Sequence, residues 1–261
     1  MGSFNAKTAQ QETEPTWLAR NFPTLFGYYK LADLVLAVSA AAKKGGAKFH
    51  TTYLDRSRQS LDVFRELGTR VEVCGLENLR SFDSPCVIVA NHMSSLETWA
   101  LHGIIYPIKE ISFVVKQTLL KYPVFSAIMR ALDPVAVSRS DPRQDLQQVL
   151  LGGEKKIAEG KSIVVFPQTT RTLDFDPAHF NSIGVKLARR AGVPVVPLAL
   201  KTDAWRPGKL LKDFGPIHPQ RAIHFCFGSP LEIKGVGRAE HEKIVAFIGQ
   251  KLAEWREHED I

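Results

Sequence analysis

The 261-residue sequence is poor in cysteine and has no long uninterrupted run of apolar residues. Its three cysteines, Cys74, Cys86 and Cys226, are odd in number and lack Cys-x-x-Cys spacing, which argues against a disulfide framework and a zinc site. A reducing, cytosol-facing environment is therefore the simpler expectation. The sequence also lacks a Gly-x-Ser-x-Gly motif and any cluster with metal-ligand spacing. We therefore expect no serine nucleophile of the hydrolase type, no metal and no bound cofactor.

What the sequence does have is a surplus of positive charge on an ordinary globular composition. Hydrophobic residues make up 44% and charged residues 23%, which suits one α/β domain with a substantial core. The 34 basic and 27 acidic residues give a formal net charge of +7. Nucleic acid, a membrane surface and anionic small molecules are all compatible partners. No alternation of basic and aromatic residues supports nucleic-acid binding, and we set it aside.

The N-terminal region divides into two parts by composition. Residues 1–14 are polar and lack the apolar core of a signal peptide, so we expect a flexible arm. Residues 17–42 are apolar, but Lys30 and Asp33 interrupt a run that is too short to span a bilayer. Aromatic residues at one end and lysines at the other suit a helix in a membrane interface, and packing on the protein's own core is the alternative. Residues 53–67 predict a second helix, which Gly68 would end.

The most informative stretch follows a short apolar run at residues 87–90, which predicts a buried strand. His92 would then lie on the turn after this strand, where open α/β folds bind ligands. Ser94 and Glu97 have the spacing of a capping box that starts a helix. Two interpretations fit equally: Glu97 only caps the helix, or it orients His92 as a general base.

A second strand pattern, residues 162–166, also ends in an unusual polar turn, Pro167-Gln168-Thr169-Thr170-Arg171. Arginine is the side chain best suited to bind a phosphate or carboxylate through two hydrogen bonds. A base after one strand and a guanidinium after another make a plausible site.

These stretches resemble the motifs of the glycerolipid acyltransferases of the lysophosphatidate type. Asn-His-x-Ser-x-x-Asp is similar to residues 91–97, and Phe-Pro-Glu-Gly-Thr-Arg to residues 166–171. Further blocks resemble residues 116–123 beginning at Lys116, residues 135–139 ending at Arg139, and residues 193–197. The five blocks occur in the family's order and cover roughly residues 70–235, which makes the resemblance specific.

The sequence departs from the family pattern at a few positions. Glu97 stands where aspartate is usual, and this longer carboxylate can still accept a hydrogen bond from an imidazole. Gln168 and Thr169 replace glutamate and glycine, which removes a negative charge and the freedom of a glycine backbone beside the acceptor site. This second difference keeps another acceptor lipid open as an alternative.

The alternation of helices and strands predicts an α/β fold with a mixed, mostly parallel sheet flanked by helices. The resemblance implies a glycerol-3-phosphate acyltransferase-like form of that fold. It also implies an N-terminal helical pair, residues 15–68, that docks on a membrane, followed by an acyltransferase domain, residues 69–261. The expected place is the cytoplasmic face of a membrane with anionic lipids, in a peripheral or monotopic arrangement.

The resemblance implies transfer of a fatty acyl group from acyl-CoA or acyl carrier protein to a hydroxyl of a lysophospholipid-type acceptor, with 1-acylglycerol-3-phosphate as first candidate. His92 would be the general base and Glu97 its orienting acid, while backbone N–H groups at the two turns would stabilise the oxyanion. The alternatives are an aminolipid or glycolipid acceptor, or a catalytically weakened lipid-binding protein. The expected substrate-binding residues are Arg171, Thr170, Thr169, Gln168, Lys116, Arg139, Asn91 and Ser94.

Overall fold

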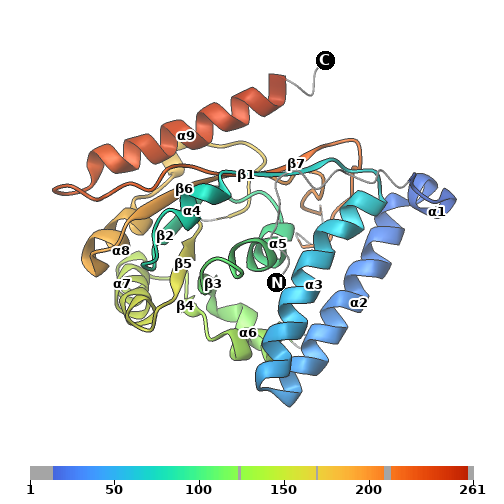
Figure 1. The fold of residues 1–261 in the computed structure, drawn as a ribbon, viewed down its shortest axis with the longest axis horizontal. Helices are drawn as coiled ribbons and strands as arrows, with labels where there is room; N and C mark the ends of the chain where they lie inside the picture. Colours follow the sequence, from blue (N-terminus) through green and yellow to red (C-terminus); the bar gives the residue numbers. More distant parts are fainter. Residues whose placement is uncertain (1–13, 123–124, 169, 209–212, 258–261) are drawn as a thin grey trace.

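A computed structural model describes residues 14–122, 125–168, 170–208 and 213–257 (Figure 1). Residues 1–13 of the expected arm, and the expected site residue Thr169, lie outside these ranges. The described residues form a seven-stranded sheet of order β1-β7-β6-β2-β5-β3-β4, in which only the β6–β7 pair is antiparallel. The strands are β1 (Val71–Cys74), β2 (Val87–Ala90), β3 (Ile111–Lys116), β4 (Val135–Val137), β5 (Ser162–Val165), β6 (Val195–Lys201) and β7 (Ile223–Phe227). The predicted mixed, mostly parallel sheet is confirmed.

Helices cover both faces of this sheet, so the central strands are apolar on both sides. Alternate residues of β2 illustrate this, because Ile88 and Ala90 belong to one core cluster and Val87 and Val89 to the other. The first face is covered chiefly by α3 (Ala47–Glu66) and α5 (Leu96–Ile105), with α4 (Leu76–Arg80) at its edge. The opposite face is covered by α7 (Pro142–Ala158), α8 (Ile183–Ala191) and α9 (Arg238–Glu257) (Figure 1).

The N-terminal helical pair is a hairpin of α2 (Pro23–Lys44) and α3, preceded by the short α1 (Trp17–Asn21). Gly45 and Gly46 both have φ near +70°, a conformation that side chains other than glycine rarely adopt, so they can make the tight turn. The helix α3 begins at Ala47, before the predicted residue 53, because Phe49 extends its buried stripe toward the turn.

The two charged residues that interrupt the apolar run, Lys30 and Asp33, lie within the unbroken helix α2. Lys30 pairs with Glu66 at 3.1 Å and Asp33 with Arg56 at 3.6 Å, so both charges bind α3. By length and composition alone, α2 is the one helix in the described ranges that could cross a membrane. Large apolar side chains on α1, on α2 and at the residue between these helices are exposed, namely Trp17, Leu18, Phe22, Leu25, Tyr29 and Leu36.

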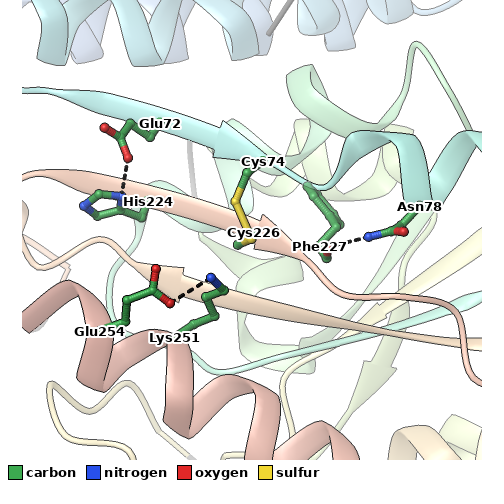
Figure 2. The surroundings of a disulfide bond; sticks show 8 residues. All are labelled: Glu72, Cys74, Asn78, His224, Cys226, Phe227, Lys251 and Glu254. Atoms are coloured by element: carbon green, nitrogen blue, oxygen red, sulfur yellow. Dashed lines mark hydrogen bonds and ion pairs between the residues drawn. A yellow bond between two sulfur atoms is a disulfide. The ribbon is translucent and has the colours of Figure 1, made fainter.

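The expectation that the cysteines form no disulfide is wrong. Cys74 on β1 and Cys226 on β7 are directly paired in the parallel register of these strands, and a disulfide joins them (Figure 2). The partners are 152 residues apart, so neither local spacing nor an odd cysteine count could reveal the pair. The third cysteine, Cys86, is a buried free thiol, and burial raises its pKa to about 11.

The start of helix α7 is set by a side-chain cap. Asp141 accepts hydrogen bonds from the backbone N–H groups of Arg143 and Gln144, and the helix begins at Pro142. It continues through Gly152 and Gly153. A Cβ atom at Gly153 would lie 2.6 Å from the Leu187 side chain, so glycine here permits close packing of α7 on α8.

Candidate active site

Parallel strands bring the predicted functional segments to one edge of the sheet. The strands β2, β5, β3 and β4 are adjacent and parallel, so their carboxyl ends lie together. His92 follows β2, Gln168 follows β5, Lys116 ends β3, and Arg139 follows β4. The predicted crevice is therefore at this edge.

His92 and Glu97 form the pair that the sequence suggested. The imidazole Nδ1 of His92 is hydrogen-bonded to Oε2 of Glu97. The other carboxylate oxygen, Oε1, accepts from the backbone N–H groups of Met93 at 2.8 Å and Ser94 at 3.0 Å, and from the hydroxyl of Thr202. Glu97 is fully buried, so these donors hold its carboxylate in one orientation. One oxygen orients the histidine while the other binds the turn.

The predicted capping box forms only in part, because Glu97 accepts from the Ser94 N–H but the Ser94 hydroxyl does not accept from the Glu97 N–H. The helix α5 begins at Leu96, and Glu97 is its second residue rather than its third. The hydroxyl of Ser94 accepts from the Leu96 N–H at 3.2 Å and donates to Thr202 at 2.9 Å. Glu97 can therefore bind the backbone of the turn and orient His92 at the same time, because its carboxylate points back to the turn that carries His92.

Two of the expected substrate-binding residues are buried and form hydrogen bonds within the protein. The side chain of Asn91 donates to the Leu200 carbonyl at 2.7 Å and accepts from the Leu200 N–H at 2.8 Å, so it joins the ends of β2 and β6. Ser94 is buried against Thr202. Both residues hold the turn in place, and neither lines the cavity described below.

Gln168 fastens the turn after β5 to the turn after β2. Its Oε1 accepts from the His92 backbone N–H at 2.7 Å, and its Nε2 donates to the Thr172 hydroxyl at 2.6 Å. The Thr172 N–H in turn donates to the His92 carbonyl at 3.0 Å. The Phe166 ring stacks on the imidazole, with 4.3 Å between ring centroids. The other residue of this turn that was expected to bind substrate, Thr170, is exposed.

These bonds also bear on the oxyanion donors. The backbone N–H groups of His92, Met93 and Ser94 already donate to Gln168 and Glu97. They therefore hold the catalytic turn together, and the expectation that the first turn supplies oxyanion donors is wrong for these three groups.

Arg171 lies beside the histidine turn and contacts residues that the motifs did not reveal. Its guanidinium donates to the Ser95 hydroxyl and forms an ion pair with Asp213. Thr202, which binds Glu97, could have been found by the same reasoning as His92, because it directly follows the buried strand β6, which is parallel to β2. No motif pointed to Ser95 or Asp213.

A cavity of about 450 Å³ begins at this group. His92, Ser95, Arg171 and Asp213 form a polar part of its wall, and most of the rest is apolar. Lys116 and Arg139 are not among the described residues of this wall. Partial desolvation lowers the pKa of Arg139, and the positive charge of Arg171 lowers it further, which shows that the two guanidinium groups repel each other. The apolar wall comes from α2, β3 and α6 (Phe125–Leu132) and includes Leu31, Val35, Phe113, Val115, Ile128 and Met129.

Comparison with known proteins agrees with this geometry. The family model described as Acyltransferase matches residues 70–201. A 1-acyl-sn-glycerol-3-phosphate acyltransferase of Pseudomonas aeruginosa is 36% identical over 188 residues, which cover 72% of this chain and 68% of that protein. The chloroplastic enzyme of the same name from Brassica napus is 34% identical over 153 residues, which cover 59% of this chain but only 42% of that protein.

The solved structure of PlsC, the 1-acyl-sn-glycerophosphate (LPA) acyltransferase of Thermotoga maritima, has the same fold. It superposes with a TM-score of 0.67 over 89% of this chain and 94% of that one, at 22% identity. Fold, site and sequence thus define one class of enzyme, the acyltransferases. The chain belongs to the acyltransferase family, and the resemblance found in its motifs is confirmed.

Proposed function

We propose that the protein transfers a fatty acyl group from an acyl thioester, acyl-CoA or acyl carrier protein, to the hydroxyl of a lysophospholipid, with 1-acylglycerol-3-phosphate as the preferred acceptor. The observation that carries the proposal is the pair of His92 and the buried Glu97 at an apolar cavity that Arg171 also lines. The names of the relatives, 1-acyl-sn-glycerol-3-phosphate acyltransferases, support the choice of acceptor.

The reaction requires a base because an alcohol is a poor nucleophile until its proton is removed. With Nδ1 bonded to Glu97, Nε2 of His92 takes the proton of the acceptor hydroxyl as its oxygen attacks the thioester carbon. The negative carboxylate stabilises the imidazolium that forms. The tetrahedral intermediate then collapses, the carbon–sulfur bond breaks, and the thiolate leaves with the proton from His92. The products are an ester and a free thiol.

The apolar cavity fits an acyl chain, and Arg171 fits an anionic headgroup. Each methylene removed from water contributes about 0.8 kcal/mol, so a long chain binds strongly without polar contacts. Arg171 at the same end of the cavity can hold a phosphate through two hydrogen bonds. Gln168 gives no reason to prefer another acceptor, because both atoms of its amide are used to fasten the two turns.

The assay that tests this function measures thiol release from acyl-CoA and from acyl carrier protein. It uses 1-acylglycerol-3-phosphate and a panel of lysolipids with choline, sugar or amino acid headgroups. We expect turnover that is fastest with the phosphate monoester. Faster turnover with a neutral headgroup would replace the acceptor by the aminolipid or glycolipid alternative. Lipid binding without turnover would favour a catalytically weakened protein.

We also propose that the protein docks peripherally or monotopically at the cytoplasmic face of a membrane through α1 and α2. The exposed side chains of Trp17 (72%) and Tyr29 (74%) support this, because such residues favour the bilayer interface. Lys43, Lys44 and Lys48 at the hairpin turn suit anionic lipids. Leu25→Ser together with Tyr29→Ser should weaken flotation with anionic liposomes. Leu151→Ser on α7, which also changes an exposed leucine, should leave it unchanged.

A further inference from the structure

The guanidinium of Arg171 already has an anionic partner within the protein. It forms an ion pair with the carboxylate of Asp213, and the Ser95 hydroxyl lies within hydrogen-bonding distance of both. The side chains of Arg171 and Asp213 are 22% and 46% exposed, and both line the cavity that holds His92. A carboxylate therefore lies where the proposed function places the phosphate of the acceptor.

Asp213 is held at this place by the segment that follows it. The Tyr28 hydroxyl of α2 donates to the Gly215 carbonyl at 2.8 Å, and the Tyr28 and Phe214 rings are in contact, with 5.8 Å between centroids. The Ile217 N–H donates to the Thr24 hydroxyl at 3.0 Å. These contacts bind residues 213–217 to α2. They therefore fix the position of the Asp213 backbone, from which the side chain reaches Arg171.

We propose that Asp213 is a specificity-determining residue: its carboxylate occupies the anion site of Arg171 in the free protein, and only an acceptor headgroup that can replace it binds productively. The proposal rests on the proposed function, because it assumes that Arg171 receives the headgroup. A neutral headgroup leaves the ion pair intact and gains nothing from Arg171. A phosphate monoester carries up to two negative charges and competes effectively with a single carboxylate.

The surrounding charges favour this exchange. After partial desolvation, the positive charge of Arg171 lowers the pKa of Arg139 further, so the two guanidinium groups repel each other. A dianion bound at Arg171 offsets this repulsion more than one carboxylate can. Asp213 therefore sets a threshold of charge, above which a headgroup binds and below which it is rejected.

The direct test measures the affinity of inorganic phosphate for the full chain by titration calorimetry, which does not depend on turnover. Asp213→Asn should bind phosphate about two- to fivefold more tightly, the range expected for the loss of a partly exposed ion pair. Glu242→Gln, which removes an exposed acid paired with Arg238 on α9, is the matched control and should have no effect. Unchanged or weaker binding in Asp213→Asn would overturn the proposal.

A double-mutant cycle separates competition from a general charge effect. In an Arg171→Gln background, Asp213→Asn should no longer change phosphate affinity. If it still does, the carboxylate acts elsewhere and the proposal is wrong. Asp213→Ser serves as a second variant, with circular dichroism and thermal melting as the check of folding.

Kinetics then distinguish this proposal from the proposed function. With 1-acylglycerol-3-phosphate, Asp213→Asn should lower KM about two- to fivefold with kcat unchanged, whereas the KM of a neutral lysolipid, which does not displace the carboxylate, should stay the same. An increase in KM would mean that Asp213 positions Arg171 rather than competes for it, which contradicts the proposal. If no lysolipid is acylated but phosphate affinity rises as expected, the proposed acceptor fails while the role of Asp213 stands.

Discussion

In the described part of the chain, two histidine–glutamate pairs lie on the same sheet in contrasting surroundings. His92 and Glu97 lie after β2 at the wall of the cavity. His224 on β7 is bonded to Glu72 on β1 at 3.1 Å, beside the disulfide (Figure 2). The same two side-chain types therefore meet at a cavity in one case and at the edge of the sheet in the other.

The difference lies in which partner of each pair is buried. Glu97 is fully buried and receives four hydrogen bonds, while its histidine reaches the cavity. In the second pair the histidine is sealed under the Trp255 ring of α9, at 4.8 Å between centroids, and the Glu72 side chain is 49% exposed. A general base must be accessible to its substrate, and the acid that orients the base must be held in a fixed position. Only the first pair meets both conditions.

Substitution of each histidine by alanine should give the largest difference between the two pairs. His92→Ala should lower kcat roughly 10²- to 10⁴-fold, the usual contribution of a general base, and it should also lower the melting temperature, because Oε2 of the buried Glu97 loses its partner. His224→Ala should lower stability alone, because it empties a buried aromatic position: roughly 2 kcal/mol of stability is lost and kcat is kept. The two measurements are initial rates of thiol release and thermal unfolding. Full turnover by His92→Ala would refute the mechanism.

The two acids give a finer contrast. Glu97→Gln keeps the shape but loses the charge that stabilises the imidazolium, so kcat should fall by roughly 100-fold. The variant should also unfold more easily, because the amide cannot accept every bond that the carboxylate accepts. Glu72→Gln removes a half-exposed partner and should change stability by less than about 1 kcal/mol, with no effect on kcat. Equal losses of activity in the two variants would contradict the assignment of Glu97.

The disulfide beside the second pair should matter for stability alone. Cys74→Ser removes a cross-link between residues 152 positions apart and should cost about 2–4 kcal/mol of stability under oxidising conditions. In a reducing buffer the variant and the parent chain should have the same melting temperature. The cytoplasm, where we propose that the protein acts, is reducing, so kcat should not depend on the disulfide. A large loss of turnover on reduction would contradict that location.

Much of the fold was accessible from the sequence because its central strands are buried on both faces. Such strands form continuous apolar runs, and β2 and β5 stood out as runs that end in polar turns. The order of helices and strands then restricted the fold class. The location of His92 and Gln168 at one sheet edge followed from that topology.

What the sequence did not reveal depends on contacts between distant segments. Cys74 meets Cys226 only because β1 pairs with β7, and Asp213 meets Arg171 only because residues 213–217 are bound to α2. Nothing local in either stretch distinguishes these residues from surface ones. The cap of α5 was predicted only in part for a different, local reason, since the position of Glu97 in this helix depends on its bonds to the turn just before it.

A third histidine extends the comparison, because it is buried without an acidic partner in the described part of the chain. His102 on α5 is packed between the Tyr53 and Tyr106 rings, near His50, and neither ring nitrogen has a hydrogen-bond partner in the described part of the chain. Burial, with a smaller effect of His50, lowers the pKa of His102 to about 3. The folded protein thus keeps this ring neutral at a pH where the unfolded chain protonates it.

The sign of the pH effect follows from this difference. Below pH 6.5 the unfolded state binds a proton that the folded state does not, so stability falls as the pH drops toward 3. The loss per pH unit grows as the pH falls and approaches about 1.4 kcal/mol only well below pH 6.5, measured as the free energy of unfolding between pH 7 and about 4.5. His102→Phe should remove this part of the slope, whereas His179→Gln, at an exposed ring, should leave it. An unchanged slope in His102→Phe would mean that another group titrates. Burial then separates all three histidines: the one at the cavity is the proposed base, the one under Trp255 is a structural contact, and the one between two tyrosines stays uncharged.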